Sequence, residues 1–281
     1  MTTNETKPLR RVVVRPLGTL ALAGGMAVAL GAASGATGPA GTQMAPATPA
    51  GQLWLVSGTE GGEGGEGGAA PVATDDRPGL LVGLMKVEAR TRNAVDLVAA
   101  GDEKTASAAV EKALHGDFES MEPALKAHKA PLFEDELVAL EKQVTKAPEA
   151  RDAAVAALDK GLAATRTALN VTPAEEFAAV VAILREAGED FGVGVKDGKL
   201  TEAPGEYRDA RGYVLAADAA LARLQGSSDA TVKAAADKSR AALAPVLAAL
   251  PDVAPKGTIA ADPALILGAA ASVELAAYKV K

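Results

Sequence analysis

From Gly79 onward the sequence repeats one pattern, in which alanine-rich stretches with apolar residues at helical spacing are separated by proline and glycine at helix-length intervals. Only 3% of the residues are aromatic although 48% are hydrophobic, so a core has to be built mostly from Ala, Val and Leu. Alanine favours helices, whereas strands favour β-branched and aromatic residues. The sequence therefore predicts an all-α fold, an antiparallel bundle of about seven or eight helices.

The positions of proline and glycine predict where these helices begin and end. In the turn before residue 173, Thr172 and Glu175 have the spacing of a capping box and Pro173 takes the first helical position. The helix that starts near Asp102 is expected to be interrupted at Gly116 and Pro123. The expected helices cover residues 80–100, 102–121, 131–144, 148–169, 173–195, 205–225, 229–250 and 262–278. They divide into two four-helix halves, near 79–170 and 172–281.

The first 36 residues have the layout of an export signal, with a basic start, an apolar run over residues 17–33 and a small-x-small end at 34–36. The alternative is a membrane anchor, for which about 17 apolar residues are marginal. Residues 37–78 are rich in Gly, Pro, Ala and Thr and predict a disordered leader, because such a segment buries little apolar surface. We expect a protein that is periplasmic or otherwise exported, and soluble after signal cleavage.

Within this leader, "GTEGGEGGEGG" at residues 58–68 matches G-x-G-x-x-G. A dinucleotide loop needs a helix opening on its last glycine, and none is expected here, while Glu63 and Glu66 would place negative charge against the phosphates. The glutamates at every third position could capture a hard cation, but a flexible backbone would have to be ordered first. We interpret the tract as a solvated tether.

Charge and cysteine content exclude several functions. Removal of residues 1–36 takes away four of the 29 basic residues and one of the 36 acidic ones, which leaves a net charge of −10 and disfavours nucleic acid as a partner. With no cysteine, the chain has no disulfide partner, thiol nucleophile or sulfur-ligated metal. It also lacks the G-x-S-x-G, H-E-x-x-H and Walker motifs, so we predict that it is not an enzyme.

Two groups of side chains have metal-ligand chemistry. Glu111, His115 and Glu119 follow one another at intervals of four, which would place an imidazole and two carboxylates on one helix face. The alternative is a solvated polar face, and His128 is interpreted as a helix-end residue that contacts terminal carbonyls. The second group consists of acidic residues on either side of residue 197, and we favour surface charge over a metal site for them. Its members are Glu186, Asp190, Glu202, Glu206 and Asp209.

Residues 185–217, "REAGEDFGVGVKDGKLTEAPGEYRDARGYVLAA", resemble the extracytoplasmic helical segment of bacterial high-affinity iron permeases and related exported helical proteins. The shared features are an acidic-aromatic helix end at residues 189–191, a V-x-D-G-K turn at 195–199, the pair Glu206-Tyr207, and the step from Asp209 to Tyr213. The resemblance implies a periplasmic all-helical domain linked to iron or another divalent cation. It also places a histidine where this chain has Glu88.

The function that we expect is therefore an exported helical binding or accessory protein for iron or other cation uptake, with Glu88, Glu111, His115 and Glu119 as metal ligands. A divalent or ferric cation is the only cofactor that the sequence indicates, and a membrane transport protein is the expected partner. The alternative is a structural or interaction protein that binds a partner through acidic helical faces without a metal.

Overall fold

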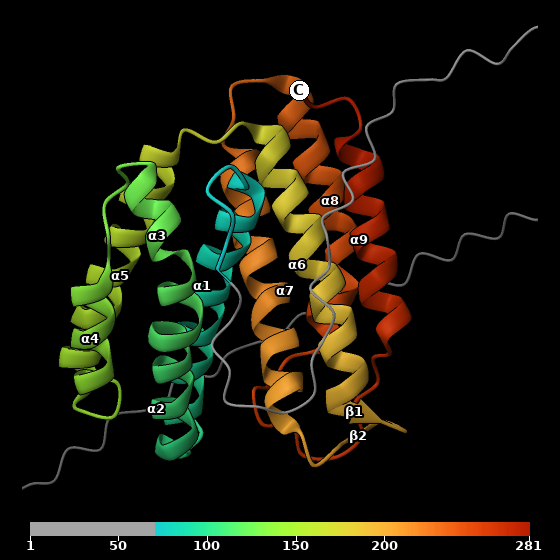
Figure 1. Ribbon diagram of the computed structural model, residues 1–281. Helices are drawn as coiled ribbons and strands as arrows, with labels where there is room; N and C mark the ends of the chain where they lie inside the picture. Colours follow the sequence, from blue (N-terminus) through green and yellow to red (C-terminus); the bar gives the residue numbers. More distant parts are fainter. Residues whose placement is uncertain (1–70) are drawn as a thin grey trace, which may run out of the picture. The chain divides into compact units, whose positions relative to one another are not determined.

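The computed structural model describes residues 71–281, which form an almost entirely helical structure (Figure 1). The predicted signal peptide and the predicted leader up to residue 70, including the glycine-glutamate tract, lie outside the described residues. Within the described part, the predicted all-α fold is confirmed. Its helices are α1 Arg77–Ala99, α2 Glu103–Glu111, the π-helix η1 Lys112–Phe118, α3 Glu119–Ala127, α4 Glu134–Gln143, α5 Pro148–Leu169, α6 Pro173–Gly194, α7 Pro204–Gln225, α8 Ala230–Ala249 and α9 Pro263–Ala277.

Helices α6 to α9 form a four-helix arrangement in which α6 and α8 each contact both α7 and α9. A two-stranded hairpin, β1 Val195–Lys196 and β2 Lys199–Leu200, joins α6 to α7. Its two turn residues, Asp197 and Gly198, have φ angles of 51° and 70°, as a type I′ turn requires. This tight turn sets α6 and α7 side by side and antiparallel.

Capping residues account for the helix starts. Helix α6 begins at Pro173 with the predicted capping box of Thr172 and Glu175. Helix α1 begins three residues before the expected position, because the Asp76 side chain accepts a hydrogen bond from the Gly79 amide at 2.8 Å. Tertiary contacts begin before the start of α1, since the Val72 amide donates a hydrogen bond to the Ser120 carbonyl of α3 at 3.1 Å.

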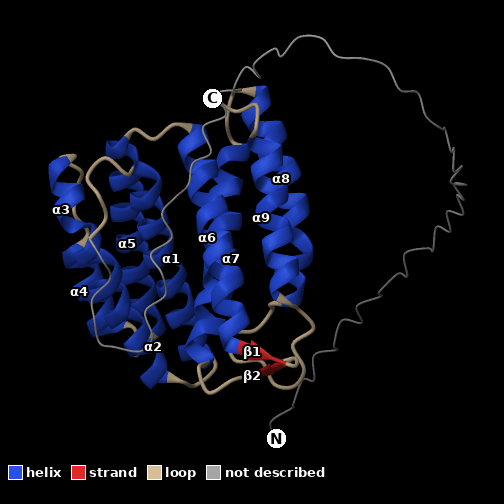
Figure 2. Cartoon of the chain, turned by 45° about the vertical axis from the view of Figure 1, so that its right-hand side comes forward, coloured by secondary structure: helices blue, strands red, loops and turns tan. Residues whose placement is uncertain are grey.

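Helix α1 packs against both parts of the bundle (Figure 2). On one side it contacts α6 and α7, and on the other it contacts α2, η1 and α5. Thirteen of its residues are buried, among them the charged Glu88 and Arg90. A helix that is covered on most sides has to bury some of its polar positions, and these then need partners.

The expected interruption at Gly116 and Pro123 is wrong. Helices α2, η1 and α3 run on continuously from residue 103 to residue 127, with Pro123 inside α3, and we call this stretch the α2–η1–α3 rod. At the end of η1, the Glu119 amide donates to the Leu114 carbonyl five residues back. A proline removes one amide donor and crowds the carbonyl four residues before it. Here that carbonyl belongs to Glu119, where the hydrogen-bond pattern changes from π to α, so the rod absorbs the proline without ending.

The few aromatic residues are concentrated in the core. All four phenylalanines are buried, and Phe118 of η1 meets Phe133 edge to face with ring centroids 4.9 Å apart. Most of the remaining core is Ala, Val and Leu, as the composition predicts. Among residues 71–281, no helix is both long enough and apolar enough to span a bilayer.

The end of α6 lies close to the backbone of α7 at Gly194. A β-carbon at Gly194 would overlap the backbone nitrogen of Tyr207, which cannot rotate away as a side chain can. We expect Gly194→Ala to lower the free energy of unfolding by about 1–3 kcal/mol. Gly205→Ala is the matched control, because a β-carbon there meets nothing within 4 Å. It should be neutral or stabilising by up to about 1 kcal/mol. Urea unfolding followed by circular dichroism measures both, and equal midpoints would contradict the close approach.

Candidate functional site

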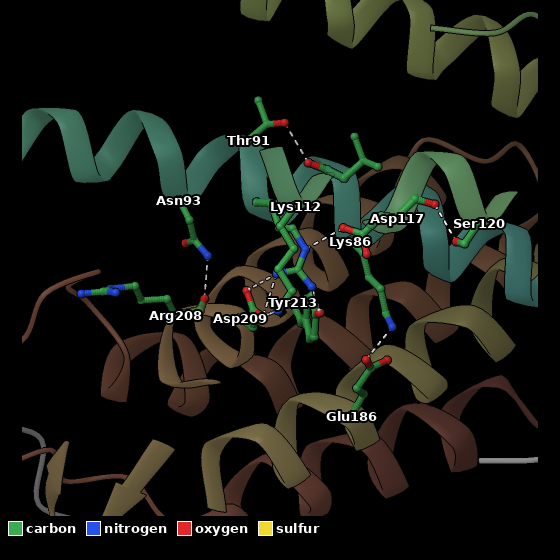
Figure 3. Close-up of polar contacts among 12 residues, drawn as sticks. Lys86, Thr91, Asn93, Lys112, Asp117, Ser120, Glu186, Arg208, Asp209 and Tyr213 are labelled. Carbon is green, nitrogen blue, oxygen red and sulfur yellow. Dashed lines mark hydrogen bonds and ion pairs between the residues drawn. The ribbon is translucent and has the colours of Figure 1, made fainter. Parts of the chain in front are cut away.

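Asp117 of η1 lies close to Asp209 and Tyr213 of α7 (Figure 3), and a buried arginine of α1 bonds to all three. Arg90 of α1 is only 5% exposed. Its Nε donates to Asp117 Oδ2 at 2.6 Å, and its Nη1 donates to both carboxylate oxygens of Asp209 at 2.6 and 2.7 Å. Its Nη2 donates to the Tyr213 hydroxyl at 3.0 Å. One guanidinium thus joins the π-helix to α7 across α1, as its planar array of donors permits.

The two aspartates around Arg90 differ in their surroundings. Asp117 is enclosed, and burial raises its pKa although the charge of Arg90 offsets part of the increase. Asp209 also accepts a hydrogen bond from Lys112 Nζ at 3.1 Å, and the Lys112 side chain reaches solvent. Asp209 therefore belongs both to the buried ion pair with Arg90 and to a more open group of acidic residues.

That region is formed by Asp190 of α6 with Glu206 and Asp209 of α7, which we call the acidic trio. One carboxylate oxygen from each residue lies within 4.8 Å of the others. Burial raises the pKa of Asp190 to about 7, and the negative charges of Glu186, Glu206 and Asp209 contribute to the increase. Carboxylates held this close repel one another, so a bound cation or a proton stabilises the arrangement.

The charges around the trio do not balance. Lys86 partly offsets the excess because its Nζ lies 2.5 Å from Glu186 Oε1 and 5.9 Å from the centre of the Tyr213 ring. When all carboxylates are ionised, five negative groups face three positive ones. The negative groups are Asp117, Glu186, Asp190, Glu206 and Asp209, and the positive groups are Lys86, Arg90 and Lys112.

Glu88, the first predicted metal ligand, is bound to arginines. It is 5% exposed, and its two oxygens accept hydrogen bonds at 2.8 Å from Arg92 of α1 and from Arg166 of α5. Arg223 of α7 lies 3.8 Å from the same carboxylate. A cation at Glu88 would have to displace these partners.

The other three predicted ligands lie along the exposed side of the α2–η1–α3 rod. His115 Nδ1 is 2.7 Å from Glu119 Oε1, and this hydrogen bond raises the pKa of His115. A proton on the imidazole competes with a metal for the same nitrogen. Within residues 71–281, the four predicted ligands do not form a group of three whose donor atoms meet within 4.8 Å, and the acidic trio does. Metal binding by Glu88, Glu111, His115 and Glu119 stays a prediction. His128 Nε2 lies 2.6 Å from the Thr74 carbonyl and donates to it, so its partner is not a carbonyl of its own helix end.

The sequence favours surface charge for the residues of the trio, although their positions contain a signal that predicts their convergence. Its members fall in the segment that carries the iron-permease resemblance, on opposite sides of the turn at residues 197 and 198. In two antiparallel helices joined by a tight turn, residues at similar distances from the turn lie next to each other. Asp190 precedes the turn by about as many residues as Glu206 follows it. That symmetry, combined with the expected helix pair, is the signal that would have found the site.

We expect Arg90→Ala to lower the free energy of unfolding by about 3–5 kcal/mol, because it removes the buried partner of Asp117 and leaves Asp209 with Lys112 alone. Arg90→Lys should recover only part of this loss, since an ammonium cannot bond to three groups in the geometry of a guanidinium. Arg185→Ala is the control, because Arg185 forms an exposed pair with Glu274 at 2.7 Å. Its loss should stay below about 1 kcal/mol. Similar losses in the two alanine variants, measured by chemical unfolding, would show that Arg90 has no special role.

The raised pKa of Asp190 predicts how stability depends on pH. In the unfolded chain an aspartate releases its proton near about pH 4, whereas folded Asp190 retains it until pH is about 7. The folded state therefore binds more protons in this interval, and stability is lost as pH rises from about 4 to about 7. Asp190→Asn removes this titration, so its stability advantage over the wild type should grow across the interval and then level off. Unfolding midpoints of chelator-treated protein measure it, and an advantage independent of pH would contradict the assignment.

Comparison with curated proteins and with solved structures finds no match to this chain. A family model does match part of it, over a range that begins at the end of α5 and covers α6 to α9 with the acidic trio, but leaves out Arg90, Lys112 and Asp117. The predicted resemblance to the helical segment of iron permeases is thereby confirmed for this part of the chain: residues 168–280 match the iron permease-associated 4-helix bundle domain.

Proposed function

We propose that this chain is an exported accessory protein of iron uptake, which binds a divalent or ferric cation at the acidic trio and passes it to a membrane transport partner. The observation that carries the proposal is the convergence of Asp190, Glu206 and Asp209 within the segment that matches the iron permease-associated domain. The proposal that the chain is exported is based on the signal peptide predicted for residues 1–36. No catalytic step is assigned to the chain.

The chemistry of the trio fits a hard cation. All three donors are carboxylate oxygens, which suit ferric iron and divalent ions such as Mn²⁺ or Mg²⁺ better than soft metals. Asp190 and Glu206 are only half-buried, so water can complete the coordination shell. The surplus negative charge around the trio favours a cation further.

The neighbours of Asp209 limit the affinity. Arg90 and Lys112 already offset its charge, so a cation gains less from Asp209 than from an unpaired carboxylate. Moderate affinity suits a protein that delivers its ion rather than storing it. The same neighbours favour the alternative, in which the cluster holds the fold together and the protein binds a partner without a metal.

Calorimetric titration of the chelator-treated full chain with Mn(II), Fe(II), Zn(II) and ferric nitrilotriacetate tests the proposal. We expect Asp190→Asn combined with Glu206→Gln to weaken binding of the hard cations by at least about 10-fold, since each carboxylate supplies charge and a ligand atom. The stability of this variant should not fall, because it removes repelling charges.

The matched control is His115→Ala combined with Glu119→Gln, which removes the histidine set and leaves the trio intact. Unchanged affinity in this control supports the trio. If the control loses binding and the trio variant keeps it, the site lies at His115. If no cation binds more tightly than about millimolar, the interaction protein without a metal becomes the better proposal.

A further inference from the structure

Helix α9 lies at the outer edge of the four-helix arrangement, where it contacts α6 and α8 (Figure 1). In the described part of the chain, four of the five large hydrophobic side chains that are exposed belong to α9 and its C-cap. Leu275 is 78% exposed and Tyr278 is 85% exposed. Exposed apolar residues that gather on one helix are a feature of interaction surfaces.

The outward face of α9 also lacks unpaired charge. Glu274 is the only charged residue between Pro263 and Ala277, and Arg185 of α6 already pairs with it at 2.7 Å. The neighbouring α8 differs, because Lys233, Asp237 and Lys238 are exposed on it. Apart from Ser272 and the paired Glu274, the exposed residues of α9 are apolar.

Five of the exposed apolar positions follow the spacing of a coiled-coil seam, with successive intervals of four, three, four and three residues, and the exposed Leu265 and Leu267 flank this line. Small residues occupy the first half of the seam and large ones the second, and a β-carbon at Gly268 would meet nothing within 4 Å. We call these positions the α9 seam: Ala264, Gly268, Ala271, Leu275 and Tyr278.

We propose that the α9 seam binds the α9 seam of a second copy of this chain, antiparallel, with the two Ala271 residues at the two-fold axis. In this pairing Tyr278 lies over Ala264 of the second copy and Leu275 lies over Gly268 of the second copy, so each large side chain meets a small one. A parallel pairing would set large against large and leave a gap at the glycines. Self-complementarity of this kind is what an isologous interface requires.

The charges at the two ends of α9 agree with the antiparallel direction. Asp262 caps the first turn and Lys279 follows the last one. An antiparallel pair places the acidic end of one helix beside the basic end of the other, and opposes the two helix dipoles. Because α9 is only about 22 Å long, the interface is small, and we expect a dissociation constant of roughly micromolar size.

The absence of cysteine in the sequence permits a direct test by single-cysteine cross-linking of the full chain. Ala271→Cys should form a disulfide-linked dimer under mild oxidation at least about 10-fold faster than Ala241→Cys, an exposed position on α8. Ala264→Cys should not, because two copies of residue 264 would lie about 21 Å apart in the antiparallel pair. If Ala264→Cys cross-links as fast as Ala271→Cys, or if Ala271→Cys is no faster than Ala241→Cys, the proposal is wrong.

Sedimentation equilibrium supplies a second measurement on protein without cysteine. We expect Leu275→Glu to raise the dimer dissociation constant by at least about 10-fold, and Ala241→Glu to leave it unchanged. Since Leu275 is exposed, the substitution does not disturb the core. A wild type that stays monomeric at about 100 µM, well above the expected dissociation constant, overturns the proposal. Binding to phosphatidylglycerol vesicles that Leu275→Glu abolishes would then assign the seam to a lipid surface.

Discussion

The contacts of one buried guanidinium organise this protein. Arg90 lies in the helix that packs on both parts of the bundle, and its donors hold a carboxylate from the π-helix on one side and a carboxylate from α7 on the other. A buried charge is tolerated only when its hydrogen-bonding groups are satisfied, so these contacts fix the relative positions of α1, η1 and α7. Because Asp209 also belongs to the acidic trio, the position of the candidate cation site depends on the same arginine.

Local features of the fold were predictable from the sequence. The capping box at Thr172, the turn at Asp197 and Gly198, and the limits of α5 follow from residues a few positions apart, and the structure has them where the sequence predicts them. The interruption predicted at Pro123 is wrong, because the effect of this proline depends on the hydrogen-bond pattern of the preceding π-helix. Asp117 and Phe118 of that π-helix make tertiary contacts with Arg90 and Phe133, which no local rule includes.

The candidate site was harder to predict for a related reason. Glu88 has the right chemistry for a metal ligand, but its two arginine partners at 2.8 Å lie four and 78 residues away, and the more distant one is visible only once α5 packs against α1. The trio, conversely, looks like surface charge until α6 and α7 are placed side by side. Asp209 of the trio is bonded to Arg90 of α1, whereas α9 contacts α6 and α8 and lies away from α1 (Figure 2). The proposed cation site and the proposed self-association surface therefore lie on different helices, with α9 contributing no member of the trio.

The π-helix has a consequence for how the chain tolerates changes in length. Each residue added to or removed from a helix rotates the downstream part of that helix by about 100°, and a π-helix accommodates one residue more than the α-helix it replaces. Deletion of a single residue between Lys112 and Asp117 could leave an ordinary, unbroken α-helix with better local geometry. It would also turn either Asp117 or the apolar face of α2 away from the core. In this segment the number of residues matters as much as their identity, and a more regular helix would give a less stable protein.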